Sequence, residues 1–287
     1  MNASDSVGLR PLMERTEGTR DIAVGVIDGP VWLDHPAFTG RRIYEIGGSP
    51  PSTCRNLGSL ACTHGTLVAG MLAAKRGSGA PAICPGCTFI LRPIFPENTE
   101  GNDPMPIATS ADLGTAISEC VAAGTNVINL SASLAQPSSR GDQQLEEALD
   151  YAAQHGVLVV AAAGNEGTVG SSAITRHPWV IPVISCDLQG KPTEQSNLGR
   201  SIGRRGLAAP GENITSIGSD GKSGTFYGTS AAAPFVTGTI ALLWSEFPTA
   251  TAAQIKLAVT RTAGRVRRTV TPPLLNAWAA YLAMSRN

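Results

Sequence analysis

The chain has 287 residues, and its 22 basic residues balance 22 acidic residues, so its formal net charge is zero. This balance gives no electrostatic reason to expect nucleic acid or an anionic membrane as a partner. The chain has no run of 18 apolar residues, and its first 20 residues lack the apolar core of a signal peptide. We therefore expect a cytoplasmic protein, although a mature secreted form would look the same.

Short apolar runs alternate with segments of helical periodicity along the chain. Runs bounded by Gly, Pro, Asn or Asp predict buried strands at 21–28, 87–95, 125–133, 156–164 and 179–186. Apolar residues at helical spacing predict helices at 64–75, 110–124, 142–156, 230–247, 250–263 and 273–285. This alternation predicts an α/β fold, a doubly wound and mostly parallel sheet with helices on both faces. We expect one domain over 21–287 after an N-terminal extension at 1–20.

Three residues at predicted element ends together suggest nucleophilic catalysis. Asp28 ends the first strand, His64 opens a helix, and Ser230 begins another. Taken singly, each is an ordinary turn or helix-start residue. Together they supply a nucleophile, an imidazole to accept its proton and a carboxylate to orient the imidazole.

An oxyanion formed during acyl transfer also needs hydrogen-bond donors. Asn165 follows an apolar strand in the sequence AAAGNEG, where its amide would complement the backbone N–H of Ser230. The alternative is a plain Asn-Glu-Gly turn. The presence of the other three residues favours an oxyanion hole.

The nucleophile motif itself has a predictable local structure. In GTSAAAP, Gly228 and Thr229 are expected to turn the chain sharply onto a helix that begins at Ser230. Pro234 is expected within the first turn of this helix, where its missing N–H costs little.

From about residue 21 to about residue 283, the chain resembles the subtilisin-like serine peptidases. The motifs that carry the resemblance are VIDGPVWLDHP, HGTLVAG, VINLSAS, AAAGNEG, APGENI and GTSAAAPFVTGTIALL. The order Asp, His, Ser is that of subtilisin rather than chymotrypsin. The resemblance implies a subtilisin-like fold and endopeptidase activity through an acyl-enzyme. It also implies that the substrate lies along Ser131, Ala132 and Ser133, with Ala162 and Gly164 among the binding residues.

Within this family, DGPV and the following HP, with PGCTFILRPIF, resemble the proteases that mature cyanobactin-type ribosomal peptides. The short segment between Asp28 and His64 leaves no room for the helical insertion of the macrocyclising members, which favours simple cleavage of a precursor peptide. A general subtilase of unrelated substrate remains an alternative. So do a transamidase that joins the acyl group to a substrate amine, and a peptide-binding protein without turnover.

Two departures from the family concern metal binding and specificity. Where many subtilisins carry a calcium-binding aspartate this chain has Ala37, and the loop 73–86 lacks the Asn-rich stretch that supplies other ligands. We therefore expect no metal or other cofactor, with a weaker calcium site left open. The loop after Asn165 carries Arg176, His177 and Trp179 in place of the family's frequent Pro-Ala turn, so the preferred substrate residue is not predicted.

The six cysteines allow several interpretations. Cys84 and Cys87 form a CPGC motif, which is compatible with a redox pair or half of a zinc site. No second CxxC completes a zinc site, and the spacing of Cys54 and Cys62 does not suit one. We favour structural thiols or one structural disulfide over a metal site.

Overall fold

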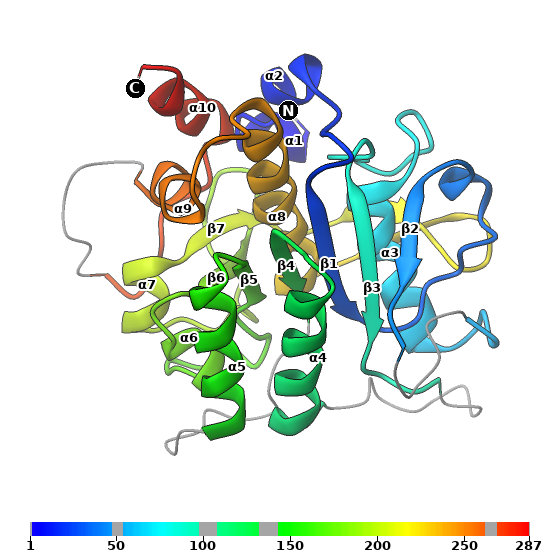
Figure 1. The fold of residues 1–287 in the computed structure, drawn as a ribbon, viewed down its shortest axis with the longest axis horizontal. Coiled ribbons are helices and arrows are strands. Elements are labelled where there is room, and N and C mark those ends of the chain that lie inside the picture. Colours follow the sequence, from blue (N-terminus) through cyan, green and yellow to red (C-terminus); the bar gives the residue numbers. More distant parts are fainter. Residues whose placement is uncertain (1, 48–53, 98–107, 132–142, 262–268, 287) are drawn as a thin grey trace.

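The computed structural model describes residues 2–47, 54–97, 108–131, 143–261 and 269–286. Its main feature is a seven-stranded parallel sheet of order β2-β3-β1-β4-β5-β6-β7, with a separate antiparallel pair, β8-β9 (Figure 1). The strands are β1 Ala23–Asp28, β2 Arg42–Glu45, β3 Thr88–Pro93, β4 Val127–Leu130, β5 Leu158–Ala162, β6 Ile181–Cys186, β7 Leu207–Pro210, β8 Ile214–Ile217 and β9 Ser223–Phe226. The predicted α/β class and parallel sheet are confirmed.

The helices within the described residues range from single turns to the long α8. They are α1 Ala3–Ser6, α2 Arg10–Arg15, α3 Leu60–Ala73, α4 Ser110–Ala122, α5 Gln143–Gln154, α6 Ala173–Arg176, α7 Arg200–Arg205, α8 Thr229–Glu246, α9 Ala252–Thr260 and α10 Ala277–Ser285, with a 3-10 turn at Pro36–Phe38. None of these helices combines the length and the apolar character that a membrane span requires.

Successive side chains of the central strands point to opposite faces of the sheet and pack into two hydrophobic cores. In β1, Val24 and Val26 face the core shared with α3 and α8, while Ile27 faces the core shared with α4 and α5. β4 and β5 alternate in the same way, so helices cover both faces of the sheet (Figure 1). The sheet is thus a buried platform whose carboxyl ends lie at one edge.

The predictions from the sequence do not include two strands of the main sheet, β2 and β7. β2 is a largely exposed edge strand of sequence RIYE, so it has no apolar run. β7 is four residues long and built from Leu, two Ala and Pro, which is too short for a periodic signal.

The first 20 residues pack on the body of the molecule. Val7, Leu9 and Leu12 are fully buried in the larger core, and the carbonyl of Val7 accepts a hydrogen bond from Ala277 N–H at the start of α10. Both termini lie at the same end of the molecule, near α2 and α10 (Figure 1). This segment therefore contributes to the same hydrophobic core as the sheet.

Candidate active site

Asp28 is the last residue of β1, which is hydrogen-bonded to β3 on one side and β4 on the other. Its side chain is fully buried at the carboxyl edge of the sheet. Its Oδ1 accepts a hydrogen bond of 2.6 Å from Gly29 N–H. A central strand therefore holds this carboxylate in a fixed place away from solvent.

His64 lies against this carboxylate. Its Nδ1 is 2.6 Å from Asp28 Oδ1, and its side chain is 21% exposed, so the ring is covered but open on one side. Because an ionised carboxylate can only accept, Nδ1 carries the proton and Nε2 is left as the acceptor. Burial lowers the pKa of His64, but the negative charge of Asp28 and its hydrogen bond raise it, and the net effect is a raised pKa.

The helix that carries His64 begins earlier than the sequence suggests. Ser59 caps α3 by accepting a hydrogen bond from Cys62 N–H, and the helix starts at Leu60. The prediction that His64 opens this helix was wrong, because the capping serine lies five residues before it. His64 therefore lies within a regular helix.

Two glycines allow α3 to approach Asp28 closely. A Cβ on Gly65 would lie 2.5 Å from the Pro30 carbonyl oxygen and would also meet that of Gly29, and a Cβ on Gly29 would meet the backbone of Ala61. Any larger residue at either position would push the helix away from the turn after β1. The Asp28–His64 contact depends on this backbone packing.

Ser230 is buried in the first turn of α8, and its Oγ donates a 2.9 Å hydrogen bond to the Ser131 carbonyl. Ser131 in turn follows β4 and donates its N–H to the Ile27 carbonyl at 3.4 Å, next to Asp28. Among the described residues the Ser230 hydroxyl makes no hydrogen bond to His64. Such bonds often form only when substrate binds. In this structure the Ser230 hydroxyl is therefore held by the Ser131 carbonyl and not by His64.

The predicted position of Pro234 was wrong. α8 begins at Thr229 after Gly228, which has φ +94°, and Pro234 lies inside the helix, one turn beyond Ser230. Its missing N–H is the group that would otherwise bond to the Ser230 carbonyl in a regular helix.

Asn165 lies beside the start of α8 at an exposed position after β5. Its Oδ1 accepts a 2.9 Å hydrogen bond from Thr229 N–H, which leaves the Nδ2 group without a hydrogen-bond partner among the described residues. The Ser230 N–H belongs to the first helical turn, where amides have no acceptor within the helix. Two donors that could stabilise an oxyanion therefore occur together.

The loop around Asn165 is held by a residue that sequence reasoning missed. Asn197 accepts hydrogen bonds from the N–H groups of Glu166 and Thr168 and donates to the Ala163 carbonyl. Gly164 has φ +103°, and a Cβ there would meet the side chain of Asn197. Asn197 has no motif in the sequence, so only its contacts reveal this role.

A second unpredicted group supports Ser131. Asn129 is fully buried in β4, donates to Ser131 Oγ at 2.7 Å and accepts from Thr237 Oγ1 at 2.8 Å. Since Thr237 belongs to α8, this contact couples the helix that carries Ser230 to the end of β4.

The predicted substrate-binding residues are only partly described. Ser131 and Ala162 are buried at the ends of β4 and β5, and Gly164 follows β5. Ala132 and Ser133 lie outside the described residues, so their role stays a prediction.

The residues after Asn165 that replace the family's Pro-Ala turn make structural contacts. His177 Nε2 is 3.1 Å from Asp150 Oδ1, and Trp179 Nε1 donates to the Val157 carbonyl at 2.7 Å. The Arg205 guanidinium donates to the carbonyl of Arg176 at 2.7 Å. Three backbone or side-chain anchors thus fix this loop.

Ala37, where many subtilisins carry a calcium-binding aspartate, has no side-chain oxygen to offer a metal ion. Ala37 is buried in the larger core, and its carbonyl accepts a 2.9 Å hydrogen bond from Lys75 N–H. These groups do not suit a calcium ion, which needs six to eight oxygens. The absence of a cofactor stays a prediction.

One disulfide is present, between Cys54 and Cys62. Cys84 and Cys87 are free and buried, as are Cys120 and Cys186. The CPGC motif is thus a pair of buried thiols in this structure.

The whole domain, and not only this site, is similar to known proteins. The model of the subtilase family matches residues 19–277. Subtilisin amylosacchariticus from Bacillus subtilis subsp. amylosacchariticus is 30% identical over 238 residues, which cover 82% of this chain. The chain spans 58% of the length of that relative.

Solved structures of peptide-maturation proteases share the fold. A mutant of the protease domain of PatA is 30% identical with a TM-score of 0.85, covering 94% of this chain and 97% of the other. The prenylagaramide maturation protease PagA is also 30% identical, with a TM-score of 0.82 and coverages of 96% and 98%. The PatG macrocyclase in complex with peptide, at 22% identity and a TM-score of 0.81 over 95% of this chain and 94% of the other, shares the fold alone. The resemblance to the PatA-like proteases is confirmed, and the chain belongs to the subtilase family of subtilisin-like serine proteases.

Proposed function

We propose that this protein is a serine endopeptidase that hydrolyses peptide bonds through an acyl-enzyme. The observation that carries the proposal is the 2.6 Å contact between buried Asp28 and His64, at the same sheet edge as Ser230. A serine hydroxyl is a weak nucleophile until a neighbouring imidazole accepts its proton. The oriented His64 is suited to that task.

Each residue has a distinct role in the proposed reaction. His64 Nε2 takes the proton of Ser230 Oγ as this oxygen attacks the peptide carbonyl, and Asp28 stabilises the resulting imidazolium. Asn165 Nδ2 and the Ser230 N–H hold the oxyanion. His64 then protonates the leaving amine, and water resolves the acyl-enzyme by the reverse proton transfers.

The substrate is proposed to bind as an extended strand beside Ser131, Ala132 and Ser133. The Ser131 carbonyl is occupied by the Ser230 hydroxyl in this structure. A substrate N–H that takes over this acceptor would release the hydroxyl toward His64. Substrate binding and nucleophile activation would then be one event.

The proposed substrate is a ribosomally made precursor peptide, cut once by hydrolysis in the cytoplasm. Support comes from the similarity to PatA and to PagA, which is named a maturation protease, both at 30% identity over nearly the whole chain. No charge pattern argues for nucleic acid or a membrane as an alternative partner.

The test is covalent labelling followed by product analysis. A fluorophosphonate probe should label the parent protein at Ser230, and a Ser230→Ala variant should neither be labelled nor cleave a peptide library. A Ser285→Ala variant, at the exposed end of α10, serves as the matched control and should behave like the parent. A folded parent that is not labelled would indicate a peptide-binding protein instead. Cyclic products, each lighter by one water than the linear product, would indicate a transamidase.

A further inference from the structure

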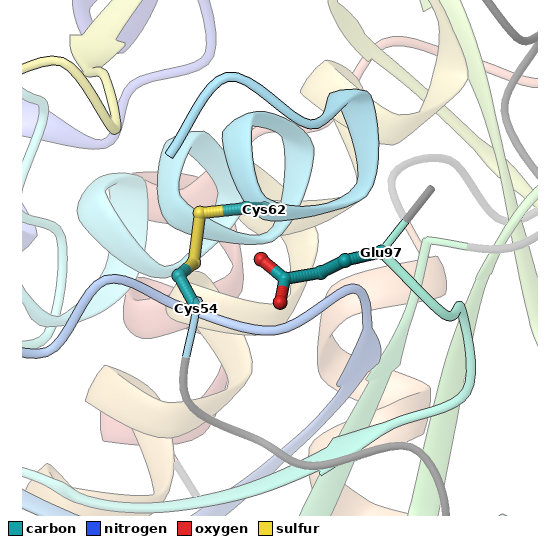
Figure 2. A group of neighbouring side chains, drawn as sticks. All are labelled: Cys54, Cys62 and Glu97. Atoms are coloured by element: carbon teal, nitrogen blue, oxygen red, sulfur yellow. A yellow bond between two sulfur atoms is a disulfide. The ribbon is translucent and has the colours of Figure 1, made fainter. Parts of the chain in front are cut away.

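The disulfide links the two parts of the candidate active site. Cys62 lies in the first turn of α3 and is bonded to Cys54 (Figure 2). It is two positions before His64 and is fully buried. Its partner Cys54 donates its N–H to the Val31 carbonyl at 3.4 Å, in the segment that follows Asp28. The bond therefore connects the chain beyond Asp28 directly to the helix that carries His64.

The loop between the two cysteines is also held by Glu97, in the segment that follows β3. The Glu97 carboxylate accepts hydrogen bonds from Arg55 N–H, at 2.9 and 3.0 Å, and from Asn56 N–H at 3.0 Å. Figure 2 shows its side chain directed toward the disulfide, and its carboxylate lies within 4.8 Å of both sulfur atoms. The disulfide and the hydrogen bonds of Glu97 therefore hold the loop 54–62 together.

Ser219 connects the loop 54–62 to Thr63, the residue before His64. Ser219 Oγ donates to the Leu57 carbonyl at 2.5 Å and lies 2.9 Å from Thr63 Oγ1. Loss of the disulfide would leave the Glu97 and Ser219 contacts in place. We therefore expect its removal to loosen α3 without unfolding it.

We propose that Cys54–Cys62 is a redox modification site for small dithiols, and that its oxidation state sets how firmly α3 presents His64 to Asp28. The effect on peptide hydrolysis rests on the proposed function. The effect on His64 itself does not, because it concerns only the Asp28–His64 contact.

The exchange chemistry has a preferred direction of attack. Cys54 is partly exposed while Cys62 is fully buried, so a dithiol thiolate reaches the Cys54 sulfur first. The Cys54–Cys62 bond breaks, a mixed disulfide forms at Cys54, and Cys62 leaves as a thiolate that then takes up a proton. The second thiol of the reagent then displaces Cys54. Two electrons and two protons pass to the protein, and the reagent ends as its own disulfide.

The experiment compares oxidised protein with protein reduced by dithiothreitol, with a chelator present in both so that no metal ion binds the freed thiols and Glu97. The His64 titration is followed by NMR, and kcat/KM is measured against pH with a cleavable peptide. Reduction should move the His64 titration and the acid limb of kcat/KM to lower pH, because a looser contact with Asp28 raises the His64 pKa less. It should lower kcat/KM roughly 10- to 100-fold, the range expected for a small misplacement of a catalytic group.

Variants separate this role from a general loss of folded protein. The Cys54→Ser/Cys62→Ser variant should have the His64 titration and kcat/KM of the reduced parent, and dithiothreitol should change neither. Cys120→Ala, which keeps the disulfide, should respond like the parent. Reoxidation with a small-molecule disulfide should restore the parent titration.

The outcomes are distinguishable from those of the proposed function. An unchanged His64 titration on reduction, or a double-serine variant that still responds to dithiothreitol, would overturn the redox proposal. A redox-dependent His64 titration in a protein that hydrolyses no peptide in either state would support the redox site and count against the proposed peptidase.

Discussion

Replacing Asp28 by asparagine tests the central contact of the candidate site with almost no change in side-chain volume. Oδ1 of Asp28 receives hydrogen bonds of 2.6 Å from both His64 Nδ1 and Gly29 N–H, and the side chain is inaccessible to solvent. An amide can preserve these two bonds only by placing its NH₂ group at the Oδ2 position. That position is buried, and Oδ2 has no hydrogen-bond partner among the described residues. The alternative orientation presents NH₂ to His64 and selects the wrong tautomer.

Both orientations remove the negative charge that stabilises the imidazolium. The expected loss in kcat/KM is about 10⁴-fold, comparable to the fall in kcat that the same change causes in a well-known Ser-His-Asp protease. This corresponds to about 5.5 kcal/mol of transition-state stabilisation.

The pH profile provides a second, independent readout. His64 must be neutral to act as a base, so activity of the parent should rise with pH through the raised pKa of His64. Burial, the largest cause, still lowers the pKa of His64 in Asp28→Asn, while the negative charge that raises it is gone. The acid limb should therefore move to lower pH.

The assay is kcat/KM against pH with a fluorogenic peptide, with thermal unfolding to show that the variant is folded. A folded variant that loses less than tenfold in kcat/KM and keeps the parent's acid limb would refute the assigned role of Asp28.

Three further predictions concern the surroundings of this pair. Asn165→Asp keeps an acceptor for Thr229 N–H but loses the Nδ2 donor, so kcat should fall about 10²–10³-fold with little change in KM; a parent-like kcat in steady-state assays would exclude an oxyanion role. Gly65→Ala should lower the free energy of unfolding by about 1–3 kcal/mol because its Cβ would overlap backbone oxygens. Denaturant titration measures this loss, and Gly47→Ala, in open space, should lack it. Chelation by EDTA should leave Tm unchanged, since Ala37 offers no ligand; a large fall in Tm would reveal a calcium site.

The predictable part of the fold consists of elements with long apolar signals. The sequence predicts β1, β3, β4, β5 and β6 because these strands are buried on both faces and therefore appear as apolar runs. The edge strand β2 is mostly exposed, and its place is decided by pairing with β3. The predicted start of α3 at His64 was wrong because Ser59 caps the helix and α3 begins one turn earlier, at Leu60.

In the candidate site, too, some residues can be predicted from the sequence and others cannot. Asp28, His64, Asn165 and Ser230 could be named from sequence because each lies in a distinctive motif. Asn129 and Asn197 could not, since each acts through contacts with residues distant in the chain. The spacing of Cys54 and Cys62 also does not predict whether they are free thiols or a disulfide, which only their contact in the fold shows.

The chemical groups of the candidate site, and the edge of the sheet at which they lie, follow from the amino-acid sequence, because parallel strands bring their carboxyl ends together. How those groups are arranged depends on the folded packing. It placed the Ser230 hydroxyl on the Ser131 carbonyl rather than on His64, and it tied the start of α3 to the segment after Asp28. These arrangements depend on packing between segments far apart in the chain, which local patterns do not encode.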